Sequence, residues 1–221
     1  MEQLQNQLFS AMLKSGALRF GDFTLKSGRR SPYFFNSGDL LAQGDNLSLL
    51  ADAFADRVVE LAQAGKCDHL FGPAYKGIAL AAATAAALSH KHKLNLPWGY
   101  NRKETKAHGE GGQLVGAPPS GKVVLLDDVL TSGMAVRQAF ELLNQTDAQP
   151  CALLLLLDRE EPGPGGKRAS AELAAAFGIE VHALASLGQL IRWLENQPGM
   201  EQPAATLRSH AQTTAQASDG A

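Results

Sequence analysis

The hydrophobic positions of the chain follow two alternating patterns. Short apolar runs that predict strands begin near residues 67, 95, 123, 151 and 181. The runs over 123–126 and 151–157 are apolar at every position, which is typical of strands buried on both faces of a parallel sheet. Between these runs, apolar residues recur at helical spacing over 45–64, 78–88, 134–144 and 169–177. Strands that alternate with helices predict an α/β fold with a doubly wound, mainly parallel central sheet flanked by helices.

Both ends of the chain depart from this alternation. Residues 4–18 carry a helical stripe that ends near Gly16, and the alternation around Phe23 and Leu25 predicts a hairpin that turns at Ser27 and Gly28. After the strand near 181, residues 187–194 predict a closing helix. The stretch from 198 onward is mostly Gln, Ala, Thr and Ser, which predicts a disordered or loosely helical tail. We therefore expect one domain over 1–197, with hood elements over 1–45 and a core over 65–195, followed by a tail over 198–221.

Composition narrows the class of protein. The chain has 221 residues, of which 45% are hydrophobic and 19% are charged, enough for one full α/β core and short for two. A net charge of −2 gives no general attraction to nucleic acid or acidic membranes, so anion binding must come from local Lys and Arg side chains. The cysteines Cys67 and Cys151 lie in or beside apolar runs and indicate core residues more than a disulfide, redox or zinc site. Because no stretch approaches the ~18 apolar residues of a membrane span and no signal peptide is recognisable, we expect a cytoplasmic protein.

Two carboxylates, Asp127 and Asp128, end the central strand, and Thr131, Ser132 and Gly133 lead at once into a helix. The backbone N–H groups of such a turn and the positive end of the helix can hold a phosphate. Carboxylates at the carboxyl end of a parallel strand lie where open α/β sheets bind ligands. A phosphorylated sugar would suit both ends, with its hydroxyls or an attached metal facing the carboxylates. Alternatively, the carboxylates simply end a strand and a hydroxyl residue caps the helix.

Two further segments have the chemistry of anion binding. The turn over 72–77 is bracketed by glycines and carries Tyr75 and Lys76 at its tip, so it could cradle an anion or be a plain loop. The segment over 101–112 combines cationic or titratable side chains with three glycines and has no apolar periodicity. It could be a solvated loop, or a lid that stabilises a departing diphosphate and excludes water. Its side chains of interest are Arg102, Lys103, Lys106 and His108.

The stretch over 123–135 resembles the PRPP-binding signature of type I phosphoribosyltransferases. In that signature, apolar residues precede two acidic residues and a T-x-G-T phosphate loop, which Asp127, Asp128, Thr131 and Gly133 match. Met134 departs from it, because the family usually has a second Thr there that contacts the 5′-phosphate. The resemblance implies PRPP contacts at Asp127, Asp128, Val129, Leu130, Thr131, Ser132, Gly133, Met134 and Ala135.

The run over 23–36 is similar to the N-terminal signature of one branch of the family, the orotate phosphoribosyltransferases. The residue types alone leave Lys26 as a solvated lysine, and Phe34 and Phe35 either as core or as a wall for a flat heterocycle. The resemblance implies that Lys26 reaches the PRPP and base site, that Phe34 and Phe35 line the orotate pocket and that Thr131 lies near orotate. Arg159, which could otherwise pair with neighbouring acids, corresponds to the arginine that holds the orotate carboxylate, a planar recognition suited to guanidinium.

The two cationic segments also have counterparts in this branch. The turn over 72–77 corresponds to the pyrophosphate loop, which implies PRPP contacts from Tyr75 and Lys76 and often a cis peptide between Ala74 and Tyr75. The segment over 101–112 is similar to the catalytic loop, which reaches into the active site of the partner subunit. The resemblance thus implies a homodimer with shared sites. The resemblance also implies that Lys106 and His108 act in the chemistry and contact PRPP, and that Arg102 and Lys103 hold phosphates.

The implied reaction transfers the 5-phosphoribosyl group from PRPP to N1 of orotate, giving orotidine 5′-phosphate and pyrophosphate in pyrimidine (UMP) biosynthesis. We expect Mg²⁺ to be bound mainly through PRPP and water near Asp127 and Asp128, which with Lys106 and His108 form the catalytic set. A phosphoribosyltransferase for another base would share the acidic pair and the phosphate turn. It would not need Phe34, Phe35, the lid and Arg159 in combination. A PRPP-sensing regulator would need a nucleic-acid-binding face, for which the chain has neither an added helix-turn-helix segment nor a basic excess.

Overall fold

The computed structural model describes residues 2–24, 28–106, 112–130 and 133–219. None of the helices in these ranges has both the length and the apolar composition needed to cross a membrane. The elements are, in order, α1 (Glu2–Lys14), β1 (Leu18–Thr24), β2 (Arg30–Phe35), α2 (Ser37–Leu41), α3 (Gly44–Gln63), β3 (His69–Gly72), α4 (Lys76–His92), β4 (Trp98–Lys106), β5 (Gly112–Gly116), β6 (Ser120–Val129), α5 (Met134–Leu143), β7 (Asp147–Asp158), α6 (Ala169–Phe177), β8 (Glu180–Ser186), α7 (Leu187–Leu194) and α8 (Glu201–Asp219).

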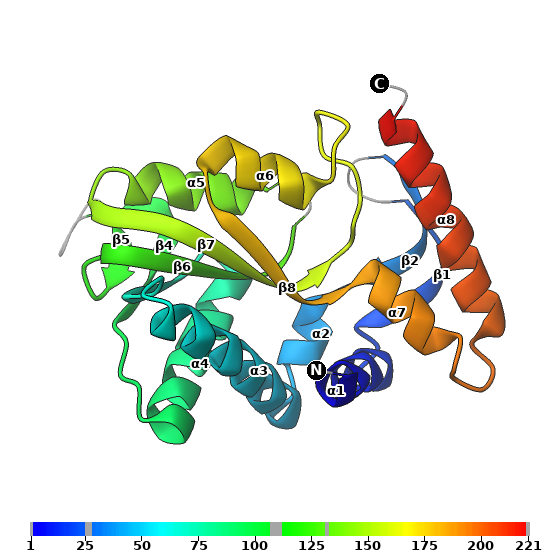
Figure 1. Ribbon diagram of the computed structural model, residues 1–221, viewed down its shortest axis with the longest axis horizontal. Helices are drawn as coiled ribbons and strands as arrows, with labels where there is room; N and C mark the ends of the chain where they lie inside the picture. The colour runs from blue at the N-terminus through cyan, green and yellow to red at the C-terminus, as the bar shows by residue number, and fades with distance from the viewer. Residues whose placement is uncertain (1, 25–27, 107–111, 131–132, 220–221) are drawn as a thin grey trace.

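A six-stranded sheet forms the centre of the described part of the chain, in the order β5-β4-β3-β6-β7-β8. Strands β4, β3, β6, β7 and β8 run parallel, and β5 pairs antiparallel with β4 at one edge. Helices α3 and α4 cover one face of the sheet, and α5 and α6 cover the other (Figure 1). This arrangement confirms the predicted doubly wound, mainly parallel α/β fold.

The central strands are buried on both faces, as their uninterrupted apolar sequence predicts. In β6, Val123 and Leu125 belong to the apolar cluster shared with α5 and α6. The alternate residues Val124 and Leu126 belong to the larger cluster on the opposite face. Successive side chains of a strand point to opposite faces, so a strand between two helix layers needs apolar residues at every position.

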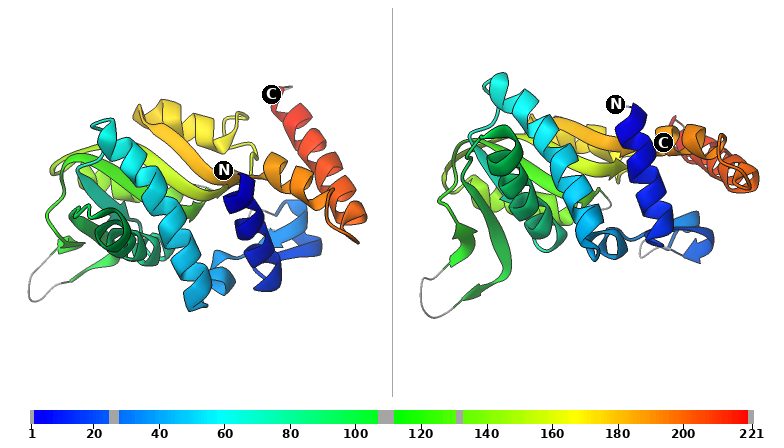
Figure 2. Two further views of the ribbon diagram at one scale, coloured as in Figure 1. Left: turned by 60° about the horizontal axis from the view of Figure 1, so that its bottom comes forward. Right: turned by 90° about the horizontal axis from the view of Figure 1, so that it is seen from below.

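A hood of N- and C-terminal elements lies beside the carboxyl ends of the strands. It consists of the antiparallel β1–β2 hairpin together with α1, α2, α7 and α8, seen in blue and in orange to red (Figures 1 and 2). The hairpin is the one predicted from the alternation around Phe23, although Leu25 to Ser27 lie outside the described residues. The hood brings β2 and α2 next to the loops that follow the strands.

The C-terminal segment is a packed helix, where the sequence predicted a disordered or loosely helical tail. The structure places helix α8 there, with Ala204 and Leu207 buried. Ala211, one turn further along, packs partly against the same cluster. These residues recur at helical spacing and form a narrow apolar stripe. A count of large apolar side chains misses such a stripe, because small residues let a helix pack closely without contributing much hydrophobicity.

The segment over 101–112 also differs from the predicted loop. Strand β4 continues to Lys106 and β5 begins at Gly112, so that residues 107–111 alone lie outside the described structure. The two strands form a hairpin that extends away from the sheet, in green in Figure 2. A hairpin that leaves the body of the protein has no core face. Its strands therefore carry no apolar alternation from which the sequence could predict them.

Candidate functional site

Two of the predicted anion-binding segments lie side by side at the centre of the sheet. The turn over 72–77 follows β3, and Asp127 and Asp128 end β6, which is the parallel neighbour of β3. From β3 the chain moves outward to β4 on one side, and from β6 it moves outward to β7 on the other. The topological switch point therefore lies between β3 and β6, where open α/β sheets bind their ligands.

A direct ion pair joins these two segments. Lys76 Nζ lies 2.9 Å from Asp128 Oδ2 and 3.4 Å from Asn36 Oδ1. The Ser37 hydroxyl, at the start of α2, donates to the same Asp128 oxygen. Three separate parts of the chain thus converge on one buried carboxylate: the hood, the turn after β3 and the end of β6.

Asp127 is buried beside this ion pair, with 8% of its surface exposed. Its Oδ1 accepts a hydrogen bond from the Asp128 backbone N–H at 2.9 Å. Burial raises the pKa of Asp127, the neighbouring Asp128 carboxylate raises it further, and the Lys76 ammonium opposes the rise. The two carboxylates at this strand end can accept hydrogen bonds from sugar hydroxyls and attract a cation, and the Lys76 ammonium can donate hydrogen bonds to an anion.

Two glycines allow the turn over 72–77 to fold back onto β6. A Cβ at Gly72 would overlap the Gly77 carbonyl oxygen, and a Cβ at Gly77 would lie 2.6 Å from the Leu126 carbonyl oxygen. The peptide bond between Ala74 and Tyr75 is cis, as the family resemblance implied. The glycines that bracket the turn are therefore required by close packing of the backbone.

Strand β4 supports the tip of this turn. Asn101, which is 4% exposed, accepts a hydrogen bond from the Ala74 backbone N–H at 3.2 Å through its Oδ1 atom. Lys103 Nζ lies 4.4 Å from the centroid of the Tyr75 ring. Together with Lys76, which opens α4, Lys103 places a second cation at the turn. The role of Asn101 could not be predicted from the sequence, because its partner Ala74 is 27 residues away in the chain.

The phosphate-binding turn predicted after β6 leads into α5. Gly133 has a left-handed φ of 67° and precedes the first helical residue, Met134, which is 62% exposed. Because both α4 and α5 begin at this edge of the sheet, the positive ends of two helices meet at the site. Leu130 is buried in the apolar cluster near α5, so its side chain anchors the turn.

Strand β2 places the predicted aromatic pair on its two faces. Phe35 is 6% exposed and lies in the larger core. Phe34 lies on the other face, where its ring centroid is 5.6 Å from that of Phe23 and 5.3 Å from Arg19 Cζ. The pair directly precedes Asn36, which reaches Lys76, so β2 ends at the site. Phe34 thus lies outside the larger core, and orotate contacts from both rings stay predictions.

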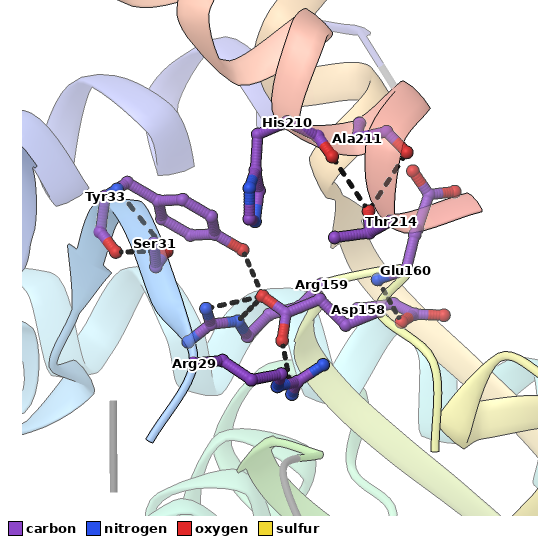
Figure 3. Close-up of polar contacts among 10 residues, drawn as sticks. Arg29, Ser31, Tyr33, Asp158, Arg159, Glu160, His210, Ala211 and Thr214 are labelled. Atoms are coloured by element: carbon purple, nitrogen blue, oxygen red, sulfur yellow. Dashed lines mark hydrogen bonds and ion pairs between the residues drawn. The ribbon is translucent and has the colours of Figure 1, made fainter. Parts of the chain in front are cut away.

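Arg159 follows β7, the strand next to β6, and is 6% exposed. Its Nε and Nη2 atoms donate to Glu161 Oε1 at 2.8 and 2.5 Å, and its Cζ lies 4.6 Å from the Tyr33 ring centroid. Figure 3 shows this guanidinium beside the Tyr33 ring, with the side chain of Arg29 close by. Pairing with a neighbouring acid, one of the two alternatives that the sequence left open, is therefore present.

Several predicted site residues cannot be placed. Lys26, Thr131, Ser132 and His108 lie outside the described residues, and Lys106 is described only by its backbone at the end of β4. Arg102, at the base of the same hairpin, has Nη1 3.5 Å from the Gly112 carbonyl oxygen. The contacts expected of these side chains with PRPP and orotate stay predictions.

Comparison with known proteins assigns the family. The model of the phosphoribosyl transferase domain matches residues 37–164. A curated orotate phosphoribosyltransferase from Thioalkalivibrio sulfidiphilus is 47% identical over 202 residues, which cover 91% of this chain and 93% of that protein. The chain belongs to the orotate phosphoribosyltransferase family. A curated orotate phosphoribosyltransferase from Pseudomonas fluorescens is 46% identical over 211 residues, which cover 95% of this chain and 97% of that protein.

Solved structures of orotate phosphoribosyltransferases confirm the fold. The structure from Francisella tularensis has a TM-score of 0.80 and 34% identity, and the match covers 94% of this chain and 98% of that chain. The structure from Aeropyrum pernix has a TM-score of 0.67 and 33% identity, with 85% and 97% covered. The type I phosphoribosyltransferase fold predicted from the sequence is therefore confirmed.

Proposed function

We propose that this chain transfers the 5-phosphoribosyl group from PRPP to N1 of orotate, forming orotidine 5′-phosphate and pyrophosphate in pyrimidine biosynthesis. Membership of the orotate phosphoribosyltransferase family supports this activity. The observation that carries it is the Lys76–Asp128 ion pair, because it joins the turn after β3 to the end of β6 at the switch point. One diphosphorylated sugar can therefore reach both segments.

In the proposed complex, each end of PRPP meets a separate backbone turn. The 5′-phosphate accepts hydrogen bonds from the turn over 131–135 and from the first N–H groups of α5. The diphosphate binds the turn over 72–77 and Lys76. Asp127 and Asp128 accept hydrogen bonds from the ribose hydroxyls between them. This arrangement holds the anomeric carbon at the mouth of the site.

The chemistry proposed at that carbon is a displacement. The bond from C1 to the diphosphate oxygen breaks and its electron pair leaves with pyrophosphate. N1 of orotate bonds to C1 and gives up its proton to the departing pyrophosphate or to water. The buried carboxylates Asp127 and Asp128 stabilise positive charge that develops on the ribose ring, and Lys76 and Lys103 stabilise the negative charge on the leaving group. Arg102, Lys106 and His108 act on the same phosphates when the lid closes.

We propose Mg²⁺ as the cofactor. Among the described residues, no group of three or more His, Cys, Asp or Glu side chains could form a metal cage. An adjacent pair of carboxylates does fit Mg²⁺, which commonly binds one or two carboxylates and substrate phosphates and retains several waters. When bound, the ion would neutralise charge on the diphosphate.

We also propose that the enzyme is a homodimer and that it works in the cytoplasm. The β4–β5 hairpin extends away from its own sheet and carries Arg102, Lys103 and Lys106, so it could complete the site of a partner subunit (Figure 2). A cytoplasmic location is consistent with the charge of PRPP, which does not cross a membrane unaided.

A substrate panel tests the activity. The purified protein is supplied with PRPP and Mg²⁺ and offered orotate, uracil, hypoxanthine and adenine in turn. We expect PRPP-dependent consumption of orotate and release of pyrophosphate. Turnover of a purine with orotate inert would contradict the proposal, and PRPP binding without turnover of any base would support a sensor.

A further inference from the structure

The side chain of Glu161, just after β7, contacts the hood through Tyr33 and Arg29. Its Oε1 atom accepts hydrogen bonds from Arg159 and, at 3.3 Å, from the Tyr33 hydroxyl, and its Oε2 atom lies 3.0 Å from Arg29 Nη2. The Glu161 side chain is 11% exposed, and that of Arg159 is 7% exposed. A nearly buried carboxylate is thus shared by two arginines from distant parts of the chain (Figure 3).

Within the part of the chain that the structure describes, Glu161 takes the Nε side of the Arg159 guanidinium, and the other edge is left for a ligand. A guanidinium has five N–H donors in one plane, and Glu161 receives one from Nε and one from Nη2. The Tyr33 ring lies against the guanidinium, with its centroid 4.6 Å from Cζ. The Nη1 donors and the second Nη2 donor form the opposite edge, which has the spacing to hold a carboxylate through two parallel hydrogen bonds.

Glu161 also neutralises Arg159, whose side chain is 7% exposed. Without Glu161, the nearly buried Arg159 would lose its neutralising partner and its fixed orientation, which is costly for a buried ion.

We propose that Glu161 is a positioning residue for recognition of the base: it fixes the guanidinium of Arg159 so that the free edge receives the carboxylate of orotate. This inference rests on the proposed function, because it takes orotate as the ligand of Arg159. The opposite reading makes Glu161 a competitor that occupies the place of the substrate carboxylate. The structure favours positioning, because Glu161 binds the Nε side of Arg159 and is held by Arg29 and Tyr33 of the hood.

Glu161→Gln is the test, with Glu160→Gln as the matched control. Glu160 is the adjacent carboxylate, but it accepts from the Gly188 backbone N–H at 2.7 Å and pairs with Arg168 at 3.1 Å. Steady-state kinetics give kcat and the KM of each substrate for the two variants and the unchanged enzyme. We expect Glu161→Gln to raise the KM for orotate about tenfold or more and to leave the KM for PRPP within about twofold. Glu160→Gln should leave both values near those of the unchanged enzyme.

The outcomes separate this inference from the proposed function. If the unchanged enzyme does not consume orotate, the proposed function fails. If it does, an orotate KM that is unchanged in Glu161→Gln overturns the positioning role, and a lowered one establishes the competitor instead. Equal rises in the KM of orotate and of PRPP would also overturn the positioning role. They would mean that the substitution distorts the whole site and not the recognition of the base alone. Should the Gln variant not fold, Glu161→Asp keeps the charge but withdraws the carboxylate, and the same selective rise is expected.

Discussion

Lys76→Met tests whether the ion pair at the switch point belongs to a PRPP site. The substitution keeps most of the apolar stem of Lys76 and removes the ammonium, which lies 2.9 Å from Asp128 Oδ2. The Lys76 side chain is 41% exposed but that of Asp128 is 8% exposed, so removing the ammonium leaves a nearly buried carboxylate without this partner and should cost more than the ~1 kcal/mol of an exposed ion pair. A hydrogen bond from Lys76 to a diphosphate is worth about 1.5–3 kcal/mol, or roughly tenfold to a hundredfold in affinity.

The chain supplies a closely matched control for this variant. Lys91 lies at the other end of the same helix, its side chain is also 41% exposed, and its Nζ pairs with Asp56 at 2.8 Å. We expect Lys76→Met to lower kcat/KM for PRPP by roughly tenfold to a hundredfold, and Lys91→Met to leave it unchanged. Thermal unfolding should shift more in Lys76→Met than in Lys91→Met, because the Asp128 side chain is 8% exposed and that of Asp56 is 51% exposed. A Lys76→Met enzyme with the PRPP kinetics of the unchanged enzyme would refute the assignment of the turn over 72–77 to the diphosphate.

Three further variants probe other parts of the account. Asp127→Asn should abolish most activity. It should also stabilise the fold relative to the unchanged enzyme, by an amount that grows as pH rises from the ordinary aspartate pKa range to neutral pH, because burial raises the pKa of Asp127 and ionising it in the folded state costs free energy. A difference in unfolding temperature that stays constant over a pH series would contradict this. Lys106→Ala should depress turnover far more than it lowers the unfolding temperature, and equal activity would remove the lid mechanism. Leu207→Ala should destabilise the protein by about 2–5 kcal/mol, since Leu207 is fully buried, whereas denaturant unfolding unchanged by the substitution would mean that α8 does not pack as described.

The sheet could be predicted from the sequence because its central strands are selected by burial on both faces. Val123 to Leu126 are apolar at four successive positions, and each of them packs in one of the two clusters. The polar strand β4 and the Ala-rich helix α8 have a weaker apolar pattern, so the sequence predicts them less clearly. A projecting hairpin buries little, and a helix that packs through Ala204 and Leu207 needs few large side chains.

The site could be predicted where a short motif contains its own chemistry. Asp127 and Asp128 end one predicted strand, and Lys76 lies in the turn after another. The parallel pairing of β3 and β6 brings them together. Ser37 and Glu161 carried no such signal. Their partners lie 91 residues away at Asp128 and 132 residues away at Arg29, so the contacts exist only once the hood has closed over the sheet.

A crystal structure with PRPP and Mg²⁺ bound tests the central claim most directly. We predict one PRPP molecule whose diphosphate contacts the turn over 72–77 and whose 5′-phosphate contacts the turn over 131–135, with the ribose hydroxyls at Asp127 and Asp128. A PRPP molecule bound away from the crevice between β3 and β6, or touching one of these turns without the other, would contradict the account.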